Sequence, residues 1–293
     1  MNNNFNYYNA LDIKNFISQN NLNVQKKFGQ NFLVNEKTTE KIVEKLEISK
    51  NDLVLEIGCG LGSLTNKIID KCKSLIGFEI DYAFITFLNN QFKDKSNFQL
   101  IEGDFLKKSR EIIQSIDKKL FNKIIIVGNL PYYITKEIFE YIFTNEIIFD
   151  KYCFMIQKEM SEKIYAKPNE EKYAYLSILS QINKEIEVVT HLSRNDFYPA
   201  PNVDSISLIF ESNTNFSIDN RPLFFKVAKS LFLNRRKTLM NNLKLSPILS
   251  ENEKNVIEKA IDNLKLNKEI RGESLSLEEI VNLSNEIFLL TNL

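Results

Sequence analysis

The sequence predicts an α/β protein with a mostly parallel, doubly wound sheet, followed by a small all-helical domain. Three observations support this prediction. Five short apolar runs alternate with stretches of helical spacing between residues 36 and 156, which is the order typical of strands joined by crossover helices. A polar stretch at 211–220 contains many turn-forming residues and is typical of a linker. Beyond this stretch, apolar residues recur at helical spacing to the end of the chain.

Local patterns place the individual elements. Apolar runs of strand length lie at 53–57, 75–80, 98–101, 124–127 and 153–156. Helical patterns lie at 36–46, 63–71, 83–91 and 135–143. A further helix at 173–181 is followed by strand-like runs at 185–190 and 205–210, which we expect to add an antiparallel edge to the sheet. A capping box from Ser276 to Glu279 precedes the last helix.

These elements divide the chain into three predicted parts. Residues 1–25 form a polar, Asn-rich extension with at most one short amphipathic helix around 11–17, and no role can be assigned to it. Residues 26–212 contain the sheet, and residues 213–293 form the helical domain. A chain of 293 residues is long enough for one large domain and one small domain.

Composition is that of an ordinary globular protein, with 43% hydrophobic and 26% charged residues. No apolar run approaches the ~20 residues of a membrane span, and the N-terminus does not resemble a signal peptide, so we expect a cytoplasmic protein without membrane association. Cys59, Cys72 and Cys153 show no C-x-x-C spacing, so we expect no disulfide framework and no metal site. The single histidine, His191, lies in a strand-like run, and we expect a structural or surface role for it rather than a catalytic one.

Charge is uneven along the chain, although 38 basic residues balance 38 acidic ones. Residues 221–250 contain seven basic residues and no acidic residue. Such a cluster can bind nucleic-acid phosphates, but it is equally typical of a solvated helix face. The charge pattern alone leaves both interpretations open.

Three consecutive predicted strands end in groups that suit an adenosine-containing cofactor. The first strand runs into a glycine-rich turn, in which Gly58 and Gly60 permit a close approach to a ligand. The dinucleotide fingerprint would need a glycine where Ser63 stands. Glu79 ends the second strand and is placed to accept hydrogen bonds from ribose hydroxyls, and Asp104 follows the third strand and could contact the adenine edge.

The fourth strand ends in the box Asn129-Leu130-Pro131-Tyr132, which resembles the signature of methyltransferases that act on exocyclic amino groups of nucleobases. The Asn129 side-chain carbonyl and the main-chain carbonyl at the Leu130–Pro131 step can accept the two hydrogens of adenine N6, which aims the nitrogen lone pair at a methyl group. Tyr132 can stack on the base, a contact worth roughly 1–3 kcal/mol. Extracting a base from its stack costs a few kcal/mol, so this contact has the right size to offset it.

Further segments resemble the boxes of the bacterial small-subunit (16S) rRNA adenine N6,N6-dimethyltransferase family. They are Lys-Lys-Phe-Gly-Gln-Asn-Phe-Leu at 26–33, Gln-Lys-Glu at 157–159, Phe-Tyr-Pro-Ala-Pro-Asn-Val-Asp-Ser at 197–205, Leu-Asn-Arg-Arg-Lys-Thr-Leu at 233–239 and Arg-Gly-Glu-Ser-Leu-Ser at 271–276. The resemblance implies a Rossmann-like class I methyltransferase fold and S-adenosyl-L-methionine as the cofactor, with S-adenosyl-L-homocysteine as the product. It also implies that two adjacent adenosines near the 3′ end of small-subunit rRNA are methylated. We expect a monomer that recognises a structured ribosomal particle rather than a short sequence.

By the same resemblance, 26–212 is the catalytic domain and 213–293 binds rRNA. The residues implied to bind the cofactor are Asn31, Leu33, Gly58, Gly60, Glu79, Asp104 and Asn129. Phe197 could form the second face of the base slot opposite Tyr132, although it is also suited to the core. The residues implied to meet rRNA phosphate are Arg235, Arg236 and Lys237. Cys59 stands where the family commonly has proline, which is expected to alter the rigidity of the glycine turn.

Two alternative functions remain open. A large-subunit rRNA adenine methyltransferase of the macrolide-resistance type shares the fold and an Asn-x-Pro-Tyr type of box, but the boxes at 197–205 and 233–239 fit the small-subunit group better. A mainly non-catalytic ribosome assembly factor would use the basic segment without methylation. A DNA adenine methyltransferase is disfavoured because no target-recognition domain is present, and a dehydrogenase because the glycine spacing is wrong.

Overall fold

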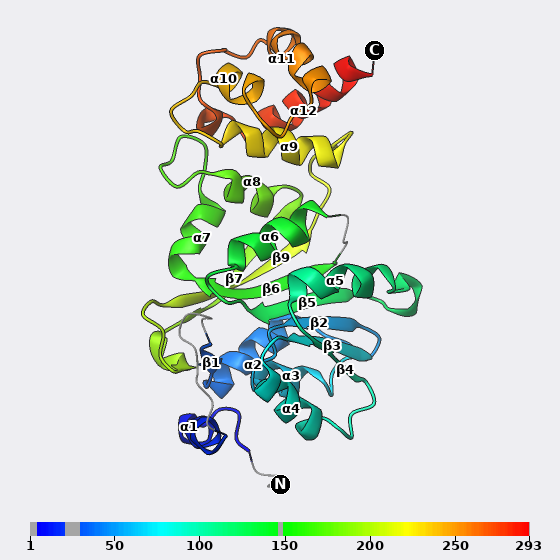
Figure 1. Cartoon of the computed structure of the whole chain (residues 1–293), viewed down its shortest axis with the longest axis vertical. Coiled ribbons are helices and arrows are strands. Elements are labelled where there is room, and N and C mark those ends of the chain that lie inside the picture. Colours follow the sequence, from blue (N-terminus) through cyan, green and yellow to red (C-terminus); the bar gives the residue numbers. More distant parts are fainter. Residues whose placement is uncertain (1–4, 21–29, 146–148, 293) are drawn as a thin grey trace. The chain divides into compact units, whose positions relative to one another are not determined.

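The computed structural model describes residues 5–20, 30–145 and 149–292, and it forms two compact units (Figure 1). The first unit comprises the described residues of Met1–Ile138, Ile147–Lys158 and Glu185–Ser212. The second comprises those of Phe139–Glu146, Glu159–Lys184 and Asn213–Leu293. Within the described ranges, no helix combines the length and apolar character that crossing a membrane would require.

The first unit contains a seven-stranded sheet in the order β4-β3-β2-β5-β6-β9-β7. Its strands are β2 (Leu53–Ile57), β3 (Ser74–Glu79), β4 (Phe98–Glu102), β5 (Ile124–Asn129), β6 (Lys151–Gln157), β7 (Lys184–Leu192) and β9 (Ser205–Ser212). Strands β2 to β6 pair in parallel, and β9 pairs antiparallel to β6. The mostly parallel sheet with an antiparallel edge is therefore confirmed.

Strand register brings the carboxyl ends of the central strands together. Ile57 of β2 lies opposite Phe78 of β3 on one side and Gly128 of β5 on the other. The chain order reverses between β2 and β5, because β3 and β4 extend the sheet in one direction and β5 and β6 in the other. Ligands in open α/β sheets bind at such a switch point, outside the carboxyl ends of the strands.

Polar side chains cap the starts of α1, α2, α4 and α5 among the helices of the first unit. Those that lie wholly within it are α1 (Ala10–Gln19), α2 (Glu36–Lys45), α3 (Ser63–Ile68), α4 (Tyr82–Gln91) and α5 (Phe105–Gln114), and α6 (Thr135–Thr144) begins in it. Asp81 accepts a hydrogen bond from the Ala83 amide at the start of α4, and Asp104 accepts one from the Leu106 amide at the start of α5. Helices α3 and α4 pack against the sheet, and the residues of β2 are all buried.

A separate two-stranded ladder joins the N-terminal segment to the end of the unit. Strand β1 (Phe32–Leu33) pairs antiparallel with β8 (Phe197–Tyr198), which places Leu33 opposite Phe197. Both side chains belong to the same cluster of buried hydrophobic residues. This ladder therefore fixes the position of residues 31–33 beside the carboxyl edge of the sheet.

The second unit is helical. Its helices are α7 (Lys158–Tyr165), α8 (Tyr175–Gln181), α9 (Arg221–Leu231), α10 (Leu239–Lys244), α11 (Glu251–Asn263) and α12 (Leu277–Thr291), with part of α6. The predicted capping box at the start of α12 is confirmed, because the Ser276 hydroxyl accepts from the Glu279 amide and the Glu279 carboxylate accepts from the Ser276 amide. The Tyr173 hydroxyl donates to the Leu275 carbonyl at 2.9 Å, which ties 159–184 to the C-terminal helices of the same unit.

Candidate cofactor pocket and basic loop

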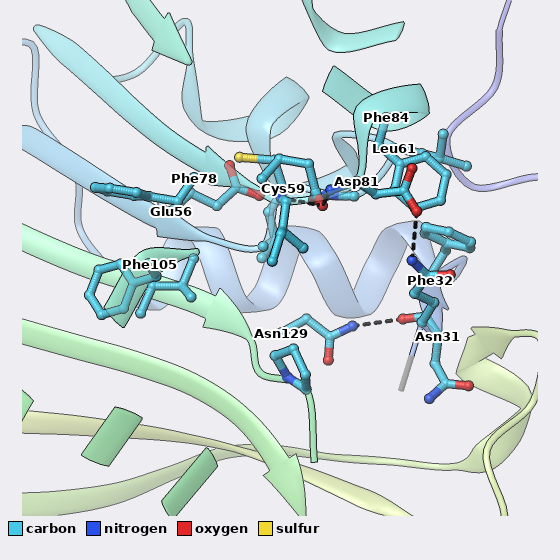
Figure 2. A pocket seen from close by; sticks show the side chains of 18 of the residues that line it. Asn31, Phe32, Glu56, Cys59, Leu61, Phe78, Asp81, Phe84, Phe105 and Asn129 are labelled. Atoms are coloured by element: carbon cyan, nitrogen blue, oxygen red, sulfur yellow. Dashed lines mark hydrogen bonds between the residues drawn. The ribbon is translucent and has the colours of Figure 1, made fainter. Parts of the chain in front are cut away.

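A pocket of about 470 Å³ lies at the carboxyl ends of β2, β3, β4 and β5 (Figure 2). Its volume falls within the ~300–1,000 Å³ typical of small-molecule sites. All seven residues predicted to bind a cofactor line this pocket: Asn31, Leu33, Gly58, Gly60, Glu79, Asp104 and Asn129. Segments that are far apart in the sequence are thus brought to one edge of the sheet.

The glycine turn adopts a backbone that ordinary side chains avoid. Gly58, Gly60 and Gly62 have φ values of +72°, +54° and +86°. The Gly58 amide donates to the Phe78 carbonyl at 2.9 Å, so the turn is held to the neighbouring strand. A Cβ added at Gly58 would meet no atom within 4 Å, so this glycine borders open space, whereas one added at Gly60 would lie 3.3 Å from the Phe32 ring.

Glu79 is almost completely buried and is held by three backbone donors. Its Oε2 accepts from the Gly60 amide at 2.7 Å, and its Oε1 accepts from the Ile80 and Asp81 amides at 2.8 and 2.9 Å. Burial raises the pKa of this carboxyl, and the three amides counteract the rise. A carboxylate offers about four lone-pair sites, so three protein donors leave Glu79 able to accept a further hydrogen bond.

Sequence reasoning missed Glu56, which lies in the apolar strand β2 and lines the same pocket. Its side chain is 1% exposed and accepts from the Thr65 hydroxyl at 2.7 Å. Burial raises the pKa of Glu56 to about 8, and the nearby charge of Glu79 adds to the rise. The available signal was a charged residue within a run of otherwise apolar strand residues. Burial also raises the pKa of the adjacent Cys59 thiol far above its usual value, which makes this cysteine a poor nucleophile.

Ile80 was also missed by sequence reasoning. It lines the pocket, yet its side chain is 65% exposed. An apolar side chain left open to solvent inside a pocket presents a surface that a flat ring could cover. Beside it, Asp81 accepts from the Gln30 side-chain amide at 3.1 Å, which links the N-terminal segment to the start of α4.

Asn129 ends β5 and points toward the N-terminal segment. Its Nδ2 donates to the Asn31 carbonyl at 2.8 Å, and its side-chain oxygen is directed away from that contact (Figure 2). The next peptide is anchored as well, because the Leu130 amide donates to the Met155 carbonyl at 3.1 Å. The Pro131 carbonyl accepts from the Thr135 hydroxyl at 2.8 Å. This box is therefore rigidly held at the edge of the pocket.

Three other residues predicted for the target base are not among those that line the pocket. The Leu130 side chain is buried. The Tyr132 hydroxyl shares a hydrogen bond of 2.9 Å with the Ser205 hydroxyl, and Phe197 is 3% exposed and packs in the core. The neighbouring Tyr133, which sequence reasoning did not single out, lines the pocket and is half-exposed.

In the second unit, the predicted RNA-binding residues lie in the loop between α9 and α10, which we call the basic loop (residues 232–238). Arg235 is held by the Glu273 carboxylate at 2.8 Å and the Glu171 carbonyl at 2.6 Å, and Arg236 is exposed. Lys237 is partly exposed. The buried Asn242 side chain, also missed from sequence, donates to the carbonyls of Leu231, Asn234 and Lys237.

Within the described parts of the chain, no group of three or more His, Cys, Asp or Glu residues is placed to hold a metal ion. The three cysteines are buried and form no disulfide.

The chain is similar to known proteins over most of its length. The sequence model of the ribosomal RNA adenine dimethylase family matches residues 21–287. Ribosomal RNA small subunit methyltransferase A of Clostridium botulinum (strain Okra / Type B1) is 37% identical over 281 residues, covering 95% of this chain and 99% of the relative. The protein of the same name from Streptococcus thermophilus (strain CNRZ 1066) is 37% identical over 268 residues, covering 90% and 91%.

Two solved structures share the fold. A dimethyladenosine transferase from Plasmodium falciparum superposes with a TM-score of 0.70 at 24% identity, covering 85% of this chain and 94% of that one. The 23S rRNA methyltransferase ErmE superposes with a TM-score of 0.60 at 21% identity, covering 88% and 100%. The fold is that of Rossmann-like class I methyltransferases.

Proposed function

The chain belongs to the ribosomal RNA adenine dimethylase family, and we propose that it transfers methyl groups from S-adenosyl-L-methionine to N6 of two adjacent adenosines near the 3′ end of small-subunit rRNA. The products would be N6,N6-dimethyladenosine and S-adenosyl-L-homocysteine. The glycine turn, Glu79, Asp104 and Asn129 all line one pocket. This observation is the main support for the proposal. The names of the curated relatives support the choice of small-subunit rRNA.

The pocket residues fit this cofactor by their chemistry. Gly58 borders open space, which allows a ligand to approach the backbone. Glu79 can still accept a hydrogen bond from a ribose hydroxyl, and Asp104 lines the pocket where the adenine edge would lie. Asn31 and Leu33 would close the site from the N-terminal side. When bound, the cofactor supplies an electrophilic methyl group on its sulfonium.

Asn129 would position the target amine. Its amide nitrogen is engaged by the Asn31 carbonyl, so its side-chain oxygen is the atom that would accept a hydrogen from adenine N6. The Leu130 carbonyl would accept the second hydrogen, and the peptide just before it is anchored to β6 through the Leu130 amide. Together the two acceptors would hold the N6 lone pair toward the methyl group, and the proton would leave to solvent after transfer. Tyr132 and Phe197 stay the proposed faces of the base slot. To reach the base, Tyr132 would have to exchange its bond with Ser205, and Phe197 would have to leave the buried cluster in which it packs.

The basic loop would contact rRNA phosphates. Arg235 is already fixed by Glu273, whereas Arg236 is exposed and Lys237 is partly exposed. Asn242 holds three carbonyls of the loop and its flanks, so the backbone that carries these cations is ordered in advance. We propose that the protein acts as a monomer on the small ribosomal subunit rather than on a short RNA.

Methyl transfer from labelled S-adenosyl-L-methionine to purified small subunits that lack adenine dimethylation tests the proposal. We expect N6,N6-dimethyladenosine in the 3′-terminal region and its loss in Asn129→Ala. Label in large-subunit RNA alone would instead indicate the resistance-type reaction. Absence of label from both subunits, with binding to the small subunit retained, would indicate an assembly factor.

A further inference from the structure

The N-terminal segment contacts the outer side of the cofactor pocket. We propose that residues 5–20, which we call the N-terminal brace, are a positioning element that holds the glycine turn and the start of α4 in the arrangement that binds S-adenosyl-L-methionine. The inference deepens the proposed function, and it rests on that function only for the identity of the cofactor. It gives a role to the extension to which the sequence alone assigned none.

The brace is an ordered piece of structure. Asn9 caps α1, and its side chain accepts from the Leu11 amide at 2.8 Å. The Asp12 carboxylate accepts from the Asn6 amide at 3.1 Å, which fixes the chain just before the helix. On the inner face of α1, Ile13 is 1% exposed, whereas Leu11 on the same helix is 61% exposed. The helix therefore has one face that packs against the unit and one that faces solvent.

Aromatic rings attach the brace to α4. Phe5 and Phe16 pack against Phe87 with ring centroids 4.9 and 4.6 Å apart, and both contacts are edge-to-face. Tyr7 stacks on Phe92, with centroids 6.4 Å apart and an interplanar angle of 16°. Aromatic pairs of this kind contribute roughly 0.5–1.5 kcal/mol beyond their buried area.

The brace shares its hydrophobic cluster with the wall of the pocket. Ile13 packs in one cluster with Phe32, Leu61, Phe84 and Phe87. The first three of these partners also line the pocket. Their side chains therefore stand between the brace on one side and the space for the cofactor on the other, and a loss of packing on the outer side would loosen the wall on the inner side.

A hydrogen bond ties the brace to the end of the glycine turn. The Tyr8 hydroxyl donates to the Ser63 carbonyl at 2.8 Å, and Ser63 lines the pocket directly after Gly62. The Lys67 ammonium lies 5.2 Å from the centroid of the Tyr8 ring and pairs with Glu36 and Glu40. Because three glycines in left-handed backbone make the turn intrinsically pliable, anchors at its end reduce the freedom that cofactor binding must otherwise remove.

Two variants of the full-length protein and one control test this role by calorimetric titration with S-adenosyl-L-methionine and no RNA. Tyr8→Phe removes the hydroxyl, and with it the hydrogen bond to the Ser63 carbonyl and the side-chain hydrogen bond with Asn66. We expect it to raise the Kd by roughly three- to tenfold. Ile13→Ala removes packing behind Phe32, Leu61 and Phe84, and we expect a tenfold or larger rise. Leu11→Ala changes the solvent face of the same helix and should leave the Kd within twofold.

Hydrogen exchange of the amides at 58–63, measured on the protein without cofactor, separates positioning from mere stability. We expect faster exchange in this turn for Tyr8→Phe at temperatures well below unfolding. A lowered melting temperature with unchanged Kd and unchanged exchange in both variants would overturn the inference. If Ile13→Ala does not fold, Tyr8→Phe decides alone. Failure of the wild-type protein to bind S-adenosyl-L-methionine would refute the proposed cofactor instead, so the two failures are distinguishable.

Discussion

The cofactor pocket of the first unit and the basic loop of the second unit differ in the charge and the burial of their polar side chains. In the pocket, the carboxylates of Glu56 and Glu79 are buried and held by hydrogen bonds at 2.7–2.9 Å. In the basic loop, Arg235 and Arg236 are exposed, and Asn242 holds the backbone beneath them. Arg235 is also held by Glu273 and the Glu171 carbonyl, so the pocket fixes buried carboxyl groups whereas the loop presents its cations at the surface.

This difference corresponds to the kind of ligand that we propose for each region. A small cofactor is recognised by a few buried polar groups. Removing one of these groups leaves its hydrogen-bond partner unpaired, which costs about 1–3 kcal/mol of free energy for each unpaired partner. A polyanion is bound by solvated cations through the release of counterions, so the contributions are spread out and fall with salt. Single substitutions should therefore have large effects in the pocket and modest, salt-dependent effects in the basic loop.

The largest effect is expected for Asn129→Ala. Loss of an acceptor that is matched to the reacting amine should lower kcat by about 10²- to 10³-fold, the range seen when one preorganised polar group is removed from an active site. Steady-state methyl transfer to small subunits measures it. Asn122→Ala, at an exposed asparagine just before β5, is the control. Activity of Asn129→Ala within threefold of the wild type would remove Asn129 from the reaction.

The second largest effect is expected for Glu79→Gln. The amide group cannot accept at both ends, so its NH2 would face either the Gly60 amide or the Ile80 and Asp81 amides. We expect the affinity for S-adenosyl-L-methionine to fall by roughly 10- to 100-fold, measured by calorimetry. Glu102→Gln is a matched control, because Glu102 is the exposed residue opposite Glu79 on β4. Equal losses in both variants would contradict a specific role for Glu79.

A third prediction concerns pH and the buried Glu56. Its pKa is about 8 in the folded protein and near 4.5 in the unfolded chain, so between these values the folded state binds more protons. The free energy of unfolding should therefore fall as pH rises from about 5 to 8, by at most about 1.4 kcal/mol per pH unit. Denaturant unfolding of the cofactor-free protein at pH 6, 7 and 8 measures this slope. Glu56→Gln should flatten it, and Glu102→Gln should not; an unchanged slope in Glu56→Gln would assign the pH dependence to other groups.

The smallest effect per residue is expected in the basic loop. Replacing Arg236 and Lys237 together by alanine should weaken small-subunit binding by about tenfold at moderate salt and reduce the slope of log K against log salt by roughly two. The Kd for S-adenosyl-L-methionine should stay unchanged. Lys259→Ala, at an exposed lysine of α11, serves as the control. A salt slope identical to that of the wild type would place the phosphate contacts elsewhere.

Sequence alone located much of the candidate site because its residues follow strand ends. Gly58, Glu79, Asp104 and Asn129 each stand at or just after a predicted parallel strand, and parallel strands place their carboxyl ends at one edge of the sheet. The capping box at Ser276 was equally predictable, because a cap is made by residues three positions apart. In both cases the determining geometry is local or follows from the order of the elements.

The tertiary structure alone decided which way the remaining side chains face and what surrounds them. Tyr132 reaches Ser205 and Phe197 enters the core, although nothing in their local sequence distinguishes these directions from a base slot. The pKa of Glu56 is raised by burial, and α1 packs in one cluster with Leu61. Both features depend on residues that are distant in the chain. Hydrophobic periodicity and the order of the elements along the chain are properties of the sequence itself. Burial and hydrogen-bond partners depend on which distant segments pack together, so only the folded structure determines them.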